Sequence, residues 1–151
     1  MEDRIRRLLD ESDIRELLLE FARALDAADW TAYAGTFAED GVFEIYDQHR
    51  TGRDEIAAGP RQDLTRWDRT QHYVTNLAVT VDGDIATARG DMLAVHIPDK
   101  SEPTKHADVG GIYHCRLRRT DEGWKFSNIR VEILWFAGLP MPRDLPLEPS
   151  A

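Results

Sequence analysis

The second half of the chain carries four long, β-prone segments in succession, and this pattern limits the possible folds more than any other feature. These segments are rich in β-branched and aromatic side chains. They cover residues 70–82, 84–97, 108–120 and 123–137. Asp82-Gly83-Asp84 and Asp121-Glu122-Gly123 are typical of tight hairpin turns, whereas a longer loop, 98–107, joins the middle pair. The pattern predicts an antiparallel sheet.

Helices are predicted ahead of these strands. Apolar residues recur at helical spacing within residues 2–28, namely Ile14, Leu17, Leu18, Phe21 and Leu25. Ser12 or Asp13 could cap this helix, so it stays open whether residues 2–10 belong to it. Further segments are predicted as a helix at 30–37, a short strand at 42–46 and a helix at 54–64 interrupted by Gly59-Pro60.

Helices followed by strands indicate one α+β domain over residues 1–151, with an irregular, proline-rich tail at 138–151. A strongly twisted sheet of long strands can curl into a cone, and its concave face can then hold a ligand. We therefore expect N-terminal helices packed on a curled, mostly antiparallel sheet.

Composition argues against several classes of partner. The 151 residues carry a net charge of −9, which disfavours nucleic acid and anionic membranes as partners. The single cysteine, Cys115, excludes an intramolecular disulfide and fits a reducing cytoplasm. We see no signal peptide, no apolar run of about 18 residues, and no phosphate-binding or zinc motif. The sequence predicts a cytoplasmic protein without membrane spans or cofactors.

Asp26 and His72 are the main candidates for chemistry. Asp26 ends the long helix, and His72 lies early in the first long strand. A carboxylate on Nδ1 of a histidine fixes the ring tautomer and stabilises the imidazolium, which makes a general base. Both faces of the strand around His72 are mixed, so an exposed aspartate and a structural histidine remain open interpretations.

Other residues could support such a site. His96 or Tyr113, which follows two glycines, could donate a hydrogen bond to a developing oxyanion. Apolar walls are expected from Phe21, Phe43, Met92, Leu93 and Trp135. Asp26, His72 and His96 could also form a two-histidine, one-carboxylate metal set, but no ligand spacing supports it, so we expect no metal.

The last strand also suggests self-association. Side chains of this strand point alternately to its two faces. One face carries Ile129, Val131, Ile133 and Trp135, and the other carries Arg130, Glu132 and Leu134. We expect part of this apolar surface to lie on the outer face of the sheet and to form a two-fold homodimer.

With these residues identified, the chain resembles the SnoaL-like branch of the nuclear-transport-factor-2-like superfamily over residues 8–137. The resemblance rests on the order and spacing of several segments. They are ALDAADW at 24–30, FAEDGVFE at 37–44, TQHYVTN at 70–76, VDGDIATARG at 81–90 and GGIYHCRLRRTDEGWKFSNIRVEILW at 110–135. The branch includes scytalone dehydratase, bile acid 7α-dehydratase, hexachlorocyclohexane dehydrochlorinase, polyketide cyclases and non-catalytic dioxygenase subunits.

The resemblance implies a cone-shaped α+β barrel of the cystatin-like type and a catalytic dyad at Asp26 and His72. His96 matches a second histidine of scytalone dehydratase, and Arg118 falls near the arginine of the dehydrochlorinases. Other pocket positions depart from scytalone dehydratase, at Leu25, Ile45, Gly111 and Tyr113, so its substrate does not transfer.

Three functions are left open. One is a cofactor-independent lyase or isomerase acting on a small, cyclic, largely apolar molecule. A second is a cyclase that closes a ring by aldol addition with the same chemistry. A third is a non-catalytic ligand-binding or assembly module of the same fold.

Overall fold

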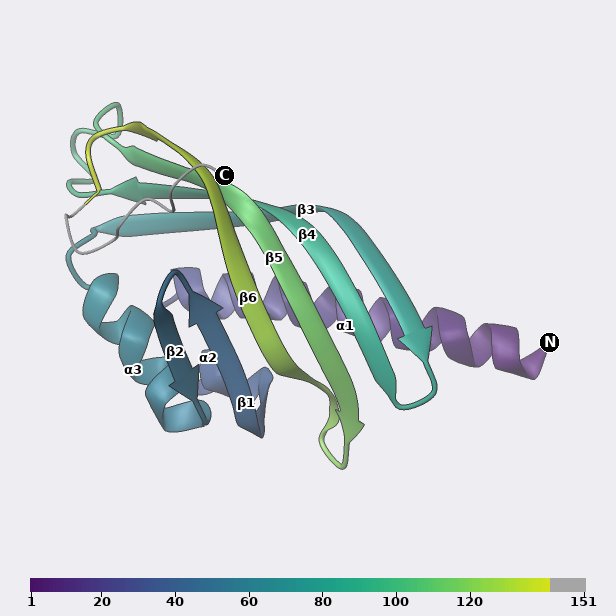
Figure 1. Ribbon diagram of the computed structural model, residues 1–151. Helices are drawn as coiled ribbons and strands as arrows, with labels where there is room; N and C mark the ends of the chain where they lie inside the picture. The colour runs from purple at the N-terminus through teal and green to yellow at the C-terminus, as the bar shows by residue number, and fades with distance from the viewer. Residues whose placement is uncertain (142–151) are drawn as a thin grey trace.

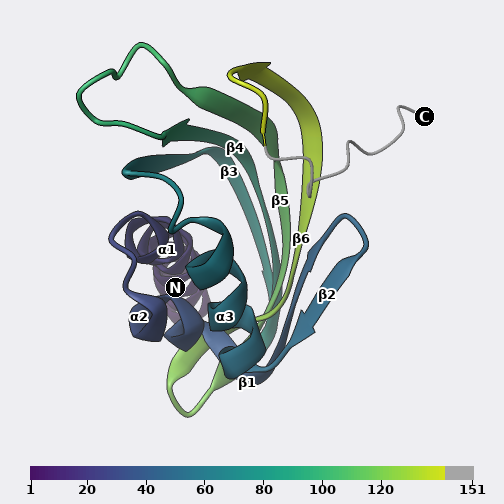
Figure 2. The same ribbon diagram turned by 90° about the vertical axis from the view of Figure 1, so that its left-hand side faces the viewer.

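The computed structural model describes residues 1–141, and its elements follow the predicted order (Figure 1). The helices are α1 (Glu2–Asp26), α2 (Trp30–Gly35) and α3 (Arg53–Asp63). The strands are β1 (Phe37–Ile45), β2 (Gln48–Thr51), β3 (Arg69–Asp82), β4 (Ile85–Ile97), β5 (Ala107–Thr120) and β6 (Gly123–Gly138). All three helices lie on the concave side of the sheet (Figure 2), which confirms the α+β class.

The six strands form one curved, mixed sheet in the order β2-β1-β6-β5-β4-β3. Neighbouring strands are antiparallel except β1 and β6, which are parallel. The sheet wraps around the helices without closing, because β2 and β3 remain as its two edges. The expected cone is therefore an open, curved sheet.

The four long strands are confirmed, and the two tight turns between them each contain a glycine with positive φ, Gly83 at 59° and Gly123 at 91°. The first part of the sheet differs more from expectation. β1 begins at Phe37 instead of residue 42, and β2 was not predicted. The parallel pairing of β1 with β6 joins segments far apart in sequence, which local patterns do not reveal.

α1 is one continuous helix of 25 residues, so residues 2–10 belong to it, and Ser12 and Asp13 lie inside the helix and do not cap it. Its apolar stripe is buried against the sheet, with Ile14 and Leu18 fully covered. Within residues 1–141 no helix combines the length and apolarity needed to cross a membrane. The predicted break in α3 is also absent, since the helix continues through Pro60.

A β-bulge in β3 explains why neither face of this strand reads as apolar. The pairing with β4 shifts between Thr75 and Ala78, and Asn76 has a positive φ of 51°. Inward-facing positions therefore change parity along the strand. They are His72 and Val74 before the bulge, and Leu77, Val79 and Val81 after it.

A second bulge, at Leu134 in β6, corrects two expectations. Gly111 pairs with Ile133 and Gly110 with Trp135, so Leu134 is an extra residue between them. Ile133 faces inward, but Trp135 is turned outward and is 46% exposed. The prediction that Ile129, Val131 and Ile133 lie on the outer face is wrong, because they belong to the concave face together with the buried core.

A partly buried ion pair fastens the N-terminal half of α1 to the sheet. Asp10 accepts hydrogen bonds from Arg119 Nη1 and Nη2, both at 2.9 Å, and from Trp124 Nε1 at 2.9 Å. The Arg119 guanidinium lies 4.6 Å from the centre of a Trp124 ring. Hydrogen bonds from Arg119 outweigh burial and lower the pKa of Asp10. Every one of these groups is satisfied within the chain.

Most of the predicted tail, residues 142–151, lies outside the described residues. Of the remainder, Gly138 ends β6 and Leu139 N–H donates to the His106 carbonyl at 2.8 Å. Met141 reaches the concave side of the sheet and lines the cavity there.

Candidate active site

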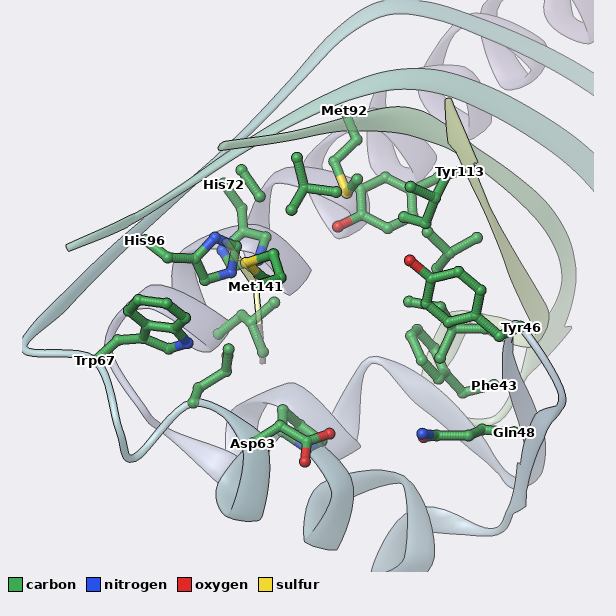
Figure 3. Close-up of a pocket in the computed structure, with 18 of the residues that line it drawn as sticks. Phe43, Tyr46, Gln48, Asp63, Trp67, His72, Met92, His96, Tyr113 and Met141 are labelled. Carbon is green, nitrogen blue, oxygen red and sulfur yellow. The ribbon is translucent and has the colours of Figure 1, made fainter. Parts of the chain in front are cut away.

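A cavity lies between the concave face of the sheet, the C-terminal end of α1, α3 and the β1–β2 hairpin (Figure 3). Its empty space is about 1030 Å³, part of which is the open mouth. A concave site with a largely apolar lining and a few polar groups is typical of small-molecule binding. Most of its lining is apolar or aromatic, including Phe21, Phe43, Met92, Val131, Ile133 and Phe136. The cavity can therefore exclude water from an apolar ring.

Asp26 and His72 meet at this cavity. Asp26 is the last residue of α1, and His72 points inward from the edge strand β3. Asp26 Oδ1 lies 2.7 Å from His72 Nδ1, and Oδ2 accepts the backbone N–H of His72 at 2.8 Å. Thr70 Oγ1 donates to Oδ1 at 3.0 Å. The carboxylate thus fixes both the main chain and the ring of His72.

These contacts determine the tautomer of His72. An ionised carboxylate only accepts hydrogen bonds, so the ring proton resides on Nδ1. Nε2 is then the nitrogen with a lone pair when the ring is neutral. The His72 side chain is only 7% exposed, so this lone pair is largely shielded from bulk water. A bound molecule with an acidic C–H group would meet a positioned base.

His96 lies beside His72 and is held in the same tautomer, with a backbone carbonyl in place of a carboxylate as its partner. Its Nδ1 is 3.2 Å from the Ala107 carbonyl, which can only accept, so Nδ1 carries the proton. Burial, reinforced by the charge of His72, lowers the pKa of His96 to about 4. The ring packs 5.2 Å from that of Trp67 and 5.7 Å from that of His72. His96 is therefore neutral at neutral pH, and its Nε2 is an acceptor.

Two tyrosines occupy the opposite wall, and Figure 3 shows the hydroxyls of Tyr113 and Tyr46 pointing into the cavity. Tyr113 is 3% exposed, and burial raises its pKa well above the ordinary value. Its hydroxyl therefore stays protonated and can donate a hydrogen bond. Tyr46 follows β1 with a positive φ of 55°. The cavity thus has an acceptor wall and a donor wall.

The structure brings seven of the ten predicted site residues together. Asp26 contacts His72, and His96, Tyr113, Phe21, Phe43 and Met92 line the same cavity. Three residues lie elsewhere. The bulge at Leu134 turns Trp135 to the convex face. Arg118 lies near the far end of β5, where it forms an ion pair with Asp40 outside the cavity. Leu93 likewise faces outward, because it alternates with inward-facing Met92.

Other lining residues were not anticipated from the sequence. Tyr46, Trp67 and Phe136 lie in a turn, a loop and a strand segment after a bulge. At the rim of the cavity, Arg50 Nη2 lies 3.6 Å from Asp63 Oδ2. Its guanidinium crosses Gly59, where a Cβ would lie 1.5 Å from Nη1. This glycine, read from the sequence as a helix breaker, instead makes room for the arginine.

The donor groups around the dyad do not form a metal centre. Among residues 1–141, no cluster of three or more His, Cys, Asp or Glu side chains is arranged to hold a metal ion. Both Asp26 oxygens point at hydrogen-bond donors from Thr70 and His72, which is the environment of a hydrogen-bonded carboxylate.

Comparisons with known proteins agree with this architecture. The sequence profile of the SnoaL-like domain matches residues 6–130. No protein of curated function matches the sequence. Three similar solved structures come from Novosphingobium aromaticivorans. A proposed aromatic ring hydroxylase is 28% identical, with a TM-score of 0.78 and coverage of 87% of this chain and 94% of that one.

The second is a nuclear-transport-factor-2-like protein with a cystatin-like fold and is 26% identical. Its TM-score is 0.74, and the match covers 88% of this chain and 87% of that one. The third, a proposed scytalone dehydratase, is 22% identical, with a TM-score of 0.82 and full coverage of both chains. At that identity the third likeness concerns the fold alone. Together these comparisons confirm the fold predicted from the sequence.

Proposed function

We propose that this chain, which belongs to the SnoaL-like domain family, is a cofactor-independent acid–base enzyme for a small, cyclic, largely apolar molecule. The observation that carries the proposal is the 2.7 Å contact between Asp26 and His72 at the wall of an apolar cavity. The name of one similar structure, a proposed scytalone dehydratase, agrees with elimination chemistry.

In the proposed reaction, His72 Nε2 removes a proton from a carbon next to a carbonyl group. The C–H electron pair moves into the enolate, and the new imidazolium is stabilised by Asp26. In a dehydration, the enolate then expels a hydroxyl group from the neighbouring carbon, and the proton held by His72 leaves with it as water. A positioned base contributes about 10²- to 10⁴-fold to the rate.

The two walls of the cavity offer different hydrogen-bonding groups to the substrate. The protonated Tyr113 hydroxyl suits the enolate oxygen, where negative charge develops. His96 was expected as an alternative donor, but its Nδ1 proton is used by Ala107 and its Nε2 only accepts. We therefore assign Tyr113 to the oxyanion and His96 to a hydroxyl group of the substrate.

This assignment covers elimination, isomerisation and aldol cyclisation, because all three begin with removal of a proton next to a carbonyl. They differ in what the enolate does next. Loss of a leaving group gives elimination, reprotonation elsewhere gives isomerisation, and attack on a second carbonyl closes a ring. We place elimination or isomerisation first, since one apolar cavity with one base suffices for them.

The proposal is tested with two assays on the purified protein. A panel of cyclic hydroxy-ketones, with matched ketones that lack the hydroxyl, is incubated and analysed by mass spectrometry for loss of one water. Base-promoted ring opening of 5-nitrobenzisoxazole, an apolar probe, reports the base without knowledge of the natural substrate. We expect wild-type turnover in both and its loss in His72→Ala. Equal activity of His72→Ala and wild type would refute the proposal.

A non-catalytic ligand-binding or assembly module is the second candidate. The exposed apolar side chains of Leu134 and Trp135 on the convex face favour it, since such surface often marks an interface. The same assays separate the two functions. A module would bind the hydroxy-ketones or a partner without turnover in the wild type.

A further inference from the structure

The two edge strands of the sheet reach the cavity from different sides. β3, which carries His72, is one edge, and β2 is the other. From β2, Gln48 and Arg50 line the cavity. Figure 3 shows Gln48 on the side away from His72 and His96. A molecule that fills the apolar middle of the cavity would therefore meet the dyad at one end and the polar side chains of β2 at the other.

The charged side chains at the cavity are mostly positive. Arg50, Arg66 and Asp63 line it, so two guanidinium groups accompany one carboxylate. The whole chain, in contrast, has a net charge of −9. Burial raises the pKa of Tyr33, another lining residue, and the charge of Arg50 opposes this effect, so the guanidinium acts on the interior of the cavity. Positive charge in a cleft of an acidic protein favours an anionic ligand there.

Gln48 and Arg50 keep hydrogen-bond donors for such a ligand. Arg50 Nη2 donates to Gln48 Oε1 at 2.7 Å, which leaves the amide NH₂ group of Gln48 for another acceptor. Asp63 Oδ2 lies farther from Nη2, at 3.6 Å. Within residues 1–141, no hydrogen bond occupies Nε or Nη1 of Arg50, although its side chain is only 21% exposed. The two side chains thus form a partly buried donor site, which we call the β2 donor pair.

We propose that the β2 donor pair, Gln48 and Arg50, binds a carboxylate group of the substrate, so that the substrate is an apolar cyclic acid. As a statement about the substrate, this inference rests on the proposed function. A carboxylate supplies both the negative charge and the acceptor oxygens that a guanidinium and an amide NH₂ group can bind together. The ring then lies in the apolar middle of the cavity, with its reactive carbon towards His72.

A purely structural role for Arg50 is the competing interpretation. Its guanidinium crosses Gly59 and could serve only to join β2 to α3. Loss of such a contact would affect every ligand of the cavity equally, and removal of the Asp63 charge would act in the same direction as removal of the Arg50 charge. A carboxylate site predicts opposite directions, because Asp63 repels the group that Arg50 attracts.

The test compares two probes by isothermal titration calorimetry, 2-naphthylacetate and its neutral amide, 2-naphthylacetamide. Both have the same ring and nearly the same shape. We expect the wild type to bind the carboxylate at least about tenfold more tightly than the amide. Arg50→Gln should lose about 10- to 100-fold in affinity for the carboxylate and less than about threefold for the amide. Asp63→Asn should bind the carboxylate about threefold more tightly than the wild type, or better.

The matched control is Arg61→Gln, which removes the same charge from an exposed residue of α3 that does not line the cavity. Its affinity for either probe should stay within about twofold of the wild-type value, because exposed charges are screened. Arg50→Lys keeps the positive charge and should retain part of the preference for the carboxylate. Amide binding shows that each variant keeps its cavity, and if Arg50→Gln fails to fold, the direction of the change in Asp63→Asn decides.

Several outcomes would overturn the proposal. They are equal affinity of the wild type for both probes, no binding of either, a parallel loss of both in Arg50→Gln, and weaker carboxylate binding in Asp63→Asn. His72→Ala separates this inference from the proposed function, because it removes the base and should still prefer the carboxylate. Carboxylate preference without any turnover by the wild type would refute the proposed reaction alone. Turnover of neutral hydroxy-ketones without carboxylate preference would refute the carboxylate site alone.

Discussion

The N-terminal half and the C-terminal end of α1 each present a carboxylate to the sheet, and we propose that the two contacts serve different purposes. Asp10 binds Arg119 and Trp124, and its two oxygens receive three hydrogen bonds from these residues. Asp26 binds His72 and also receives three hydrogen bonds. The number of contacts is the same at both ends, so it does not distinguish a structural contact from a functional one.

The difference lies in what the partner can still do. Arg119 remains protonated at all relevant pH values, and its guanidinium has no lone pair to offer. His72 gives one nitrogen to Asp26 and keeps a second for a bound molecule, at a cavity lined by aromatic residues. A carboxylate–imidazole contact at a cavity can carry out chemistry, whereas a carboxylate–guanidinium contact fastens a helix.

The largest expected effect is at the cavity end. In Asp26→Asn, the amide N–H can donate to His72 Nδ1, which moves the ring proton to Nε2 and removes the base. We expect turnover to fall by roughly 10²- to 10⁴-fold, as in His72→Ala. The free energy of unfolding should change by only about 1 kcal/mol, as the amide oxygen still accepts a hydrogen bond. Kinetics with the benzisoxazole probe and urea unfolding measure both quantities.

Asp10→Ala should show the reverse behaviour. It removes the acceptor of Arg119 Nη1 and Nη2 and of the Trp124 N–H, although Asp84 still binds Arg119 Nε, so the free energy of unfolding should fall by about 2 kcal/mol. Turnover at a temperature where the variant is folded should stay within about twofold of wild type, because the cavity is at the other end of α1. Loss of activity without loss of stability would contradict the assigned division between the ends.

The two ends should also weaken in different pH ranges. Folded His96 has a pKa of about 4, below its ordinary 6.5, so the unfolded chain binds a proton more readily between these values. The contribution of neutral His96 to the free energy of unfolding is complete above pH 6.5. It falls by about 2 kcal/mol between pH 7 and pH 5. The lowered pKa of Asp10 matters only at more acidic pH, below its ordinary value of 3.8.

Urea unfolding at pH 7 and pH 5 tests this difference with His96→Phe, which has no titrating group at that position. The decrease in stability between the two pH values should be smaller in the variant than in wild type by about 2 kcal/mol. An identical decrease in both proteins would show that His96 is not held neutral by the fold.

The smallest effect is expected for Thr70→Val, which removes one of the three hydrogen bonds to Asp26. The remaining contacts to the His72 ring and main chain still fix the carboxylate, so turnover should fall less than about tenfold. Steady-state kinetics decide the outcome. A loss as large as that of Asp26→Asn would mean that Thr70, and not the His72 main chain, positions the carboxylate.

Much of the fold was predictable from the sequence, because the long strands and α1 carry strong periodic signals and short turns. The site was predicted less directly. Strand pattern left His72 ambiguous, since the bulge at Asn76 reverses the inward parity within one strand. The residue pattern named Asp26 and His72 as candidates but left an exposed aspartate and a structural histidine open, and the resemblance to a known family then favoured a pair at one site.

The errors have the same physical origin. Trp135 was expected in the cavity wall on the same parity of its strand as Ile133, and the extra residue Leu134 turns it to the opposite face. A bulge changes the register by one residue and has no strong sequence signal, so every position beyond it is misassigned. β2 was missed because four polar or charged residues, Gln48–Thr51, form a strand only by pairing with β1.

The hydrogen bond from the His72 main chain to Asp26 has a further consequence for solubility. β3 is an edge of the sheet, and exposed edge N–H groups can template pairing with other chains and so promote aggregation. Asp26 occupies one of these donors with a negative charge at the end of α1. The residue that orients the histidine therefore also shields part of an open β-edge, so loss of the Asp26 carboxylate would expose this donor to pairing with another chain.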